Sequence, residues 1–129
     1  MAYPTDRKYT KEHEWIQVND ATATVGITDY AQQSLGDIVF VEVPKVGAEL
    51  TVGKAFGTVE SVKAVSDLFA PASGTVTAVN GELNTSPENV NKDAHGAWMI
   101  KIALNDPKQL DGLLSAADYE KFVAEEGGH

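Results

Sequence analysis

Cysteine is absent from the 129-residue chain, and this absence excludes several kinds of chemistry. Without thiols the chain can form no disulfide bond, no thiolate metal site and no cysteine nucleophile. If the protein takes part in redox or thiol chemistry, the sulfur must come from a group that is brought to it.

Long apolar runs are also absent. No stretch is long enough to cross a membrane as a helix, so we expect no membrane contact. The start, MAYPTDRKYTKEHEW, lacks the apolar core of a signal peptide and the Arg- and Ser-rich pattern of a transit peptide. We therefore expect a bacterial-type cytoplasmic location, and a processed mitochondrial chain would look the same.

Basic residues are scarce. Ten Lys and Arg stand against nineteen Asp and Glu, which gives a formal net charge of −9. Such a charge repels phosphate backbones, so nucleic acid is not an expected partner. The same charge suits encounters with basic protein surfaces, although solubility alone also accounts for it.

The motifs of common catalytic sites are missing as well. The segment between Gly47 and Gly53 is one residue too long for a phosphate loop, and Ala55 stands where that loop needs a hydroxyl. His13 lies between two glutamates, but in a strand neighbouring side chains point to opposite faces and cannot share a metal ion. No serine stands in a nucleophile elbow. We therefore predict no metal site, no catalytic residue and no enzymatic activity of the chain alone.

The pattern that is present is mainly β. Residues 14–28 read as a hairpin with a turn at Asn19 and Asp20, and residues 28–36 read as a short helix that Thr28 caps and Gly36 ends. A strand before Pro44 follows, and then come short β-prone runs, 55–61, 64–71, 74–79 and 97–104. Breaks at this spacing predict a compact β barrel or sandwich.

The tail changes to a helical period. Pro107 suits a first helical position, and Ser115 with Asp118 forms a loose capping box before a second helix. We expect one domain over residues 1–129, with a core at about 9–104 and a helix pair at about 106–125 that covers the sandwich.

One lysine stands out in the segment GTVESVKAVSD. Lys63 lies between two β-prone runs, so we predict that it stands at a hairpin tip. A nucleophilic lysine needs burial or a cationic neighbour, whereas the acids nearby, Glu60 and Asp67, favour its ammonium form. The residues alone leave an ordinary solvated lysine as the favoured interpretation, with modification by another enzyme as the alternative.

A family resemblance favours modification. GTVESVKAVSDLFAPASGTV resembles the lipoyl-attachment segment of the glycine cleavage system H protein family. YTKEHEWIQV, VGITDYAQQSLGDIVFVEVPKVG, NTSPENVN and GAWMIKI are similar to that family in the same order. The likeness extends from about Tyr9 to Phe122.

The resemblance implies a fold and a function. The fold is a barrel-sandwich hybrid of the lipoyl-domain kind, with two small antiparallel sheets, a short helix after the first hairpin and a C-terminal helix pair. Lys63 would carry lipoate in amide linkage, as a carrier in glycine catabolism and one-carbon metabolism.

The implied partners are three enzymes and a lipoylation system. The lipoyl arm would take an aminomethyl group from a glycine decarboxylase with pyridoxal phosphate (PLP). It would pass the group to an aminomethyltransferase that uses tetrahydrofolate, and a dihydrolipoyl dehydrogenase with FAD would reoxidise it. A lipoate ligase, or an octanoyltransferase with lipoyl synthase, would load the lysine. The carrier would be a monomer.

The resemblance also assigns roles to individual residues. Glu14 and Asp67 would accept hydrogen bonds from the ammonium of the loaded arm, and plain surface carboxylates are the alternative interpretation. Glu12 stands where relatives often have serine, and Ser34 where some have histidine, so arm-holding or partner contacts could differ there. Recognition by the lipoylating enzyme would involve the residues next to the lysine, Glu60, Ser61, Val62 and Ala64.

Three other functions compete. The protein could be a depot that passes lipoyl groups to 2-oxoacid dehydrogenase complexes. It could be a lipoyl or biotinyl domain of a larger complex, although Val62 and Ala64 replace the methionines typical of biotinyl carriers. It could also be an interaction module with an unmodified lysine.

Overall fold

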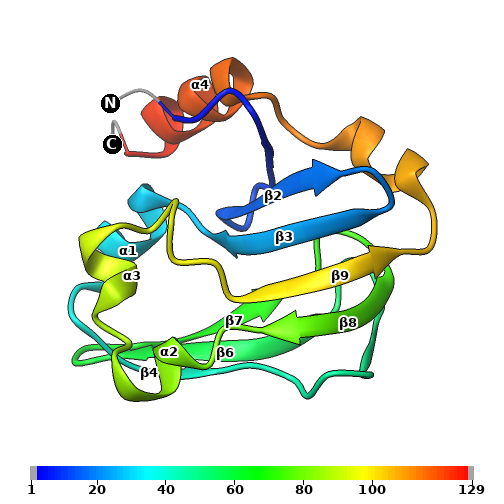
Figure 1. Ribbon diagram of the computed structural model, residues 1–129. Coiled ribbons are helices and arrows are strands. Elements are labelled where there is room, and N and C mark those ends of the chain that lie inside the picture. Colours follow the sequence, from blue (N-terminus) through cyan, green and yellow to red (C-terminus); the bar gives the residue numbers. More distant parts are fainter. Residues whose placement is uncertain (1–2, 128–129) are drawn as a thin grey trace.

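The computed structural model describes residues 3–127, and the predicted mainly β architecture with two antiparallel sheets is confirmed (Figure 1). The strands are β1 (Lys8–Tyr9), β2 (Glu14–Asn19), β3 (Thr22–Ile27), β4 (Ile38–Glu42), β5 (Glu49–Leu50), β6 (Ala55–Ser61), β7 (Val65–Phe69), β8 (Gly74–Val79) and β9 (Ile100–Leu104). The helices are α1 (Asp29–Leu35), α2 (Glu82–Thr85), α3 (Asn89–Lys92), the 3₁₀ helix η1 (Pro107–Gly112) and α4 (Ala116–Gly127). None of the described helices is long and apolar enough to span a membrane.

The two sheets differ in size. The larger has six strands in the order β1-β2-β3-β9-β8-β5, and the smaller has three in the order β4-β6-β7. Neither order closes on itself, so the sheets form a sandwich. The main core lies between them and is built from alternating side chains of both, including Ile16, Val59 and Ile102.

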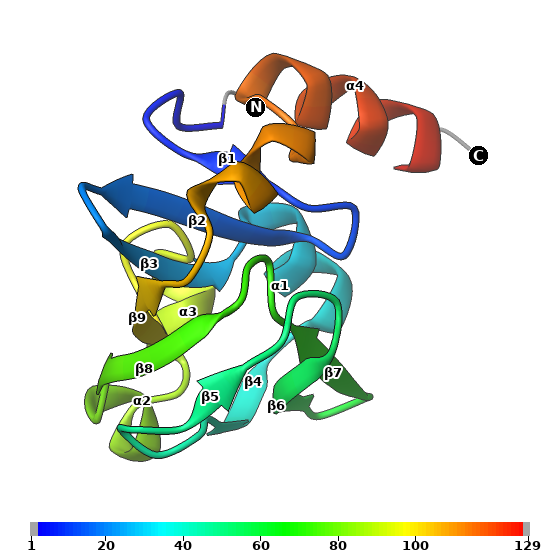
Figure 2. The ribbon, with the colours of Figure 1, turned by 90° about the vertical axis from the view of Figure 1, so that its right-hand side faces the viewer.

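Strand β2 is buried on both faces, which explains its run of three buried residues, Glu14, Trp15 and Ile16. Ile16 belongs to the main core, whereas Trp15 belongs to a second apolar cluster with Tyr9 and Tyr119. The rings of Tyr9 and Tyr119 stack at 4.8 Å, which seats α4 against β1 (Figure 2). The C-terminal helix thus covers the outer side of the larger sheet.

Several local predictions are confirmed. Residues 14–27 form the first hairpin, and Thr28 caps α1 by accepting a hydrogen bond from the Ala31 amide. Gly36 ends that helix with a φ of 82°, a conformation that favours glycine. At the second C-terminal helix, the Ser115 hydroxyl accepts from the amide of Asp118, as the capping box predicts.

Three local predictions are wrong in detail. The run 97–104 forms a strand only from Ile100, and Trp98 lies before it, partly exposed. The first C-terminal helix is a 3₁₀ helix, capped by Asp106, and not an α-helix. The two short helices α2 and α3 were not expected, because segments of four residues are too short to show a helical apolar period.

Candidate functional site

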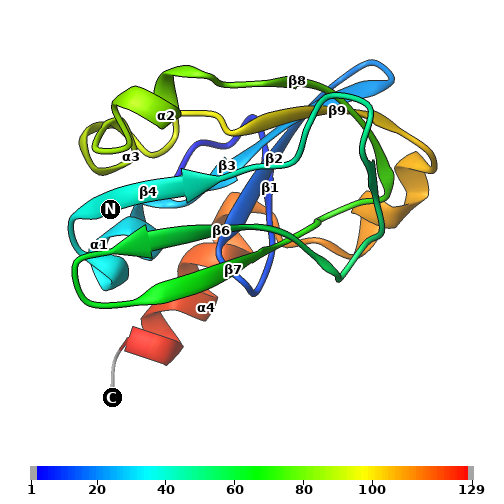
Figure 3. The ribbon, with the colours of Figure 1, turned by 90° about the horizontal axis from the view of Figure 1, so that it is seen from below.

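Lys63 stands at the tip of the hairpin that joins β6 to β7, as predicted. The strands pair in antiparallel register up to Glu60 and Val65, and the turn projects from one end of the smaller sheet (Figure 3). The Lys63 side chain is exposed, and no other residue within 3–127 holds its amine by a hydrogen bond or ion pair. A second protein that modifies lysine can therefore reach the amine.

Ser61 builds this turn. Its amide donates to the Ala64 carbonyl at 2.8 Å, and its Oγ accepts from the amides of Lys63 and Ala64 at 3.3 and 3.1 Å. The hydroxyl also lies 3.2 Å from the Ala64 carbonyl oxygen, to which it donates. Because Ser61 is buried, it holds the turn from below and leaves the Lys63 side chain outside.

The end of α1 supports the turn from the side (Figure 3). The Val62 amide donates to the Asp37 carbonyl, and a Cβ placed on Gly36 would lie 3.6 Å from Cε of Lys63. Asn91 fixes this corner, because its side chain accepts from the Ile38 amide and donates to the Gly36 carbonyl, each at 2.8 Å. The lysine stem therefore rests beside a corner of fixed geometry.

Glu14 is buried, with an exposed fraction of only 1%, so the interpretation as a surface carboxylate is wrong. One carboxylate oxygen accepts from the Thr10 hydroxyl at 2.7 Å, and the other accepts from the Phe69 amide at 3.2 Å. Phe69 belongs to β7, an edge strand of the smaller sheet, whereas Glu14 belongs to the larger sheet. The carboxylate thus joins the two sheets on the strand that follows the Lys63 turn.

Burial controls the charge of this carboxylate. Desolvation raises the pKa of Glu14 from its ordinary value of 4.5 to about 7, against the opposing effect of the hydrogen bonds from Thr10 and Phe69. The charge of Glu12 adds a small further increase. Glu14 therefore changes its charge near neutral pH, whereas an exposed glutamate would be fully ionised there.

The other predicted residues lie at the surface. Asp67 and Glu60 are exposed on β7 and β6, as are Glu12 before β2 and Ser34 on α1. Val62 and Ala64 flank the lysine, and 70% of Val62 is exposed. Glu60, Val62 and Ala64 thus lie next to the lysine at the surface, whereas Asp67 and Glu12 are exposed and Glu14 is buried.

His13 does not lie in a strand, so the prediction that its side chain and those of its neighbours alternate between the two faces of a strand is wrong. It adopts a φ of 70° in the turn before β2, and its Nδ1 lies 2.8 Å from the Tyr119 hydroxyl. No group of three or more potential metal ligands occurs among residues 3–127. His13 belongs to the contacts that hold α4.

Sequence reasoning missed three residues of this site: Thr10, Gly36 as a neighbour of the lysine stem, and Asn91. The sequence indicates the role of Thr10 only weakly: a threonine hydroxyl can accept a hydrogen bond from the amide two residues later and so close a turn, as it does here with Glu12. The sequence does not indicate the role of Asn91, because its partners lie more than fifty residues away in the chain.

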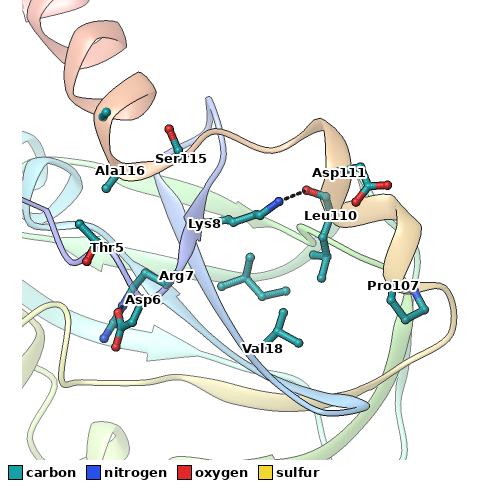
Figure 4. A pocket seen from close by; sticks show the side chains of 12 residues that line it. Thr5, Asp6, Arg7, Lys8, Val18, Pro107, Leu110, Asp111, Ser115 and Ala116 are labelled. Carbon is teal, nitrogen blue, oxygen red and sulfur yellow. Dashed lines mark hydrogen bonds and ion pairs between the residues drawn. The ribbon is translucent and has the colours of Figure 1, made fainter.

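A groove elsewhere on the molecule is a separate feature. It measures about 660 Å³ and lies between β2 and η1, with Lys8, Val18 and Leu110 among its lining residues (Figure 4). The Lys8 amine donates to the Leu110 carbonyl across it. The groove shares no residue with the Lys63 turn or with the Glu14 cluster, so it does not extend the candidate site.

Comparison with known proteins gives one consistent result. Residues 7–126 match the family model described as glycine cleavage H-protein. The glycine cleavage system H proteins of Koribacter versatilis and Acidobacterium capsulatum are 70% and 64% identical to the chain, over the full length of both proteins in each pair. A crystal structure of the H protein from Mycobacterium marinum superposes with a TM-score of 0.86 at 38% identity, covering 97% of this chain and 99% of that one.

Proposed function

The chain belongs to the glycine cleavage H-protein family, whose members are lipoyl carriers, and we propose that it carries lipoate on Lys63 and shuttles an aminomethyl group between the enzymes of that system. The observation that carries this proposal is the exposed Lys63 amine on a turn that Ser61 braces.

The residues of the turn fit a lipoyl group. The amine is open to acylation, and the nearest corner of the protein, at Gly36, has no side chain that could obstruct the stem. When bound, the group supplies the disulfide and thiol chemistry that a chain without cysteine lacks. Acylation also removes the lysine charge, so the arm can lie along the protein without burying an ammonium.

The physical advantage of such a carrier is the tether. A flexible arm on a fixed turn keeps its cargo at a high effective concentration near each enzyme that docks on the turn. The partners in this proposal are glycine decarboxylase with PLP, the aminomethyltransferase with tetrahydrofolate and dihydrolipoyl dehydrogenase with FAD. The acidic surface, at net −9, favours encounter with basic faces of these enzymes.

The loaded arm ends in a cationic amine, and Glu14 is the residue best suited to hold it. Its carboxylate is withdrawn from water, and each oxygen keeps one free acceptor position beside its hydrogen bond to Thr10 or Phe69. A charge-assisted hydrogen bond in such a place is strong and excludes water from the amine. Asp67 and Glu12 are exposed, and in this proposal they act as guides near the surface.

Two measurements test the function. Intact mass of the protein from native cells should show one lipoyl group, and peptide mapping should place it on Lys63. The lipoylated protein should support exchange between glycine and bicarbonate with a purified glycine decarboxylase, and the unlipoylated protein should not. A fully lipoylated protein that supports no exchange, yet donates its lipoyl group to a 2-oxoacid dehydrogenase, would be a depot.

Replacing Ser61 with alanine should slow lipoylation. The substitution removes the Oγ that accepts from the Lys63 and Ala64 amides, and a lost hydrogen bond of about 1 kcal/mol lowers the ratio of ordered to disordered turn roughly fivefold. The rate should be followed by mass spectrometry with a lipoate ligase in excess. Ser34→Ala, on the exposed face of α1, is the matched control and should be lipoylated at the normal rate. Equal rates for both variants would show that Ser61 does not present the lysine.

A further inference from the structure

Thr10 lies in the turn between β1 and β2 and is almost fully buried, with an exposed fraction of 8%. The turn is closed by its backbone, because the Thr10 amide donates to the Glu14 carbonyl at 2.9 Å and the His13 amide donates to the Thr10 carbonyl at 3.1 Å. These bonds close the backbone of the turn, and the threonine hydroxyl adds further hydrogen bonds to it.

The hydroxyl has its own set of partners. Its Oγ1 accepts from the backbone amides of Glu12 and Glu14, at 3.2 and 3.1 Å. A hydroxyl has two acceptor positions and one proton, so both acceptor positions are filled. The proton is left for the third neighbour, a carboxylate oxygen of Glu14 at 2.7 Å. The surroundings therefore dictate the direction of this hydrogen bond.

The second oxygen of Glu14 accepts from the Phe69 amide. With one donor on each oxygen, the carboxylate plane is fixed between β2 and β7. Of these two donors only the Thr10 hydroxyl belongs to a side chain, so it is the one that a substitution can remove.

We propose that Thr10 is a positioning residue, which fixes the direction of the Glu14 carboxylate and favours its ionised form, so that the cationic amine of the loaded arm meets an oriented anion. The inference rests on the proposed function for the identity of that amine. The physical reason is that a donated hydrogen bond stabilises the anion over the neutral acid in a place where few other groups do so.

The electrostatic surroundings agree with this role. Burial raises the pKa of Glu14, the negative charge of Glu12 raises it further, and the hydrogen bond from Thr10 is the first of the two effects that lower it. Without the hydroxyl, the carboxyl group would be more protonated at neutral pH and would attract a cation less.

The test uses two substitutions at Thr10 and one elsewhere. Thr10→Val keeps the shape of the side chain and removes the hydroxyl, and Thr10→Ser keeps the hydroxyl. Thr75→Val is the control, because Thr75 is half-buried on β8, in a different part of the fold. The pKa of Glu14 is measured in the unlipoylated proteins by carboxyl ¹³C NMR. The rate at which water hydrolyses the aminomethyl group, releasing formaldehyde and ammonia and leaving the free thiol, is measured on the lipoylated, loaded proteins.

We expect the pKa of Glu14 to increase by about one unit in Thr10→Val, because the hydrogen bond from the hydroxyl favours the ionised carboxylate. At pH 7 this change lowers the ionised fraction about fivefold, and hydrolysis of the aminomethyl group should accelerate by a similar factor. Thr10→Ser and Thr75→Val should match the wild type in both measurements.

An unchanged pKa in Thr10→Val would overturn the inference, whatever the loaded arm does, and a lowered melting temperature with an unchanged pKa would show a purely structural role. A shifted pKa with an unchanged rate of hydrolysis would retain the electrostatic role of Thr10 but overturn its role toward the arm. If the wild-type loaded arm is hydrolysed as fast as a free aminomethyl thiol, the proposed arm-holding function fails instead.

Discussion

Replacing Lys63 with arginine is expected to abolish lipoylation and to reduce glycine–bicarbonate exchange to the background of the decarboxylase alone. Arginine keeps the positive charge and the long stem, but its guanidinium stays protonated and does not become a nucleophile for acylation. Loss of the tether alone removes an effective concentration advantage of roughly 10²–10⁴-fold. Intact mass and the exchange assay measure the two effects separately.

The fold should not change in this variant, because the Lys63 side chain is exposed and forms no hydrogen bond with any other residue among 3–127. Its melting temperature should therefore equal that of the wild type. Lys54→Arg is the matched control, since Lys54 is also exposed, in the turn between β5 and β6. Normal lipoylation of Lys63→Arg, or its loss in Lys54→Arg, would place the attachment point on a different lysine.

The position of Lys63 could be predicted from the sequence because it depends on local pattern. Two β-prone runs separated by a few residues form a hairpin whatever the rest of the fold does, and a charged residue between them stays in water. Thr28 and Gly36 are local in the same sense, because a helix start and a helix end are set by neighbours within one turn. The family resemblance then supplied the chemistry that the local pattern left open.

The burial of Glu14 could not be predicted in this way. Glu14 is the first residue of β2 and follows a charged segment, and its partner Phe69 is 55 residues away, on an edge of the other sheet. The smaller sheet covers this position, since the Phe69 amide of β7 reaches the carboxylate, while the second apolar cluster covers the neighbouring Trp15 on the other face of β2. Burial on both faces of a strand removes the alternation from which exposure is predicted.

The same limit explains the tail. The leucines of the segment after Pro107 fit one face of a helix, but η1 takes the 3₁₀ form. Tertiary contacts hold it at both ends of this segment, because Leu110 is buried in the main core and the Leu114 amide donates to the Tyr9 carbonyl of β1. A short helix takes the form that its anchors allow.

Replacing Glu14 with glutamine is expected to stabilise the protein above neutral pH while it releases the loaded arm faster. The folded protein holds the proton of Glu14 up to about pH 7, whereas the unfolded chain loses it near pH 4.5. Between these values the folded state binds more protons, so the free energy of unfolding falls as the pH rises, and it levels off above about pH 7. The full decrease in the free energy of unfolding is about 3 kcal/mol.

Glutamine has no charge to bury, so this loss should be absent from the variant. Urea unfolding at pH 5 and pH 8 should show similar stabilities for both proteins at the lower pH. At pH 8 the variant should be more stable by up to about 3 kcal/mol, less the weaker hydrogen bonds of an amide. Burial lowers the pKa of His95, which gives the opposite slope, but His95 is common to both proteins and cancels in the difference. Glu49→Gln, at an exposed position on β5, should show neither effect.

The functional change should have the opposite sign. A neutral amide cannot form an ion pair with the ammonium of the loaded arm, so the aminomethyl group should be hydrolysed faster in Glu14→Gln than in the wild type at pH 8. A variant that gains stability and keeps its loaded arm as long as the wild type would show that the buried carboxylate does not hold the amine. A gain in stability together with faster hydrolysis of the aminomethyl group would show why the chain keeps an acid where burial opposes its charge. The buried anion destabilises the protein while the arm is unloaded, and the cation of the loaded arm offsets this cost when it occupies the site.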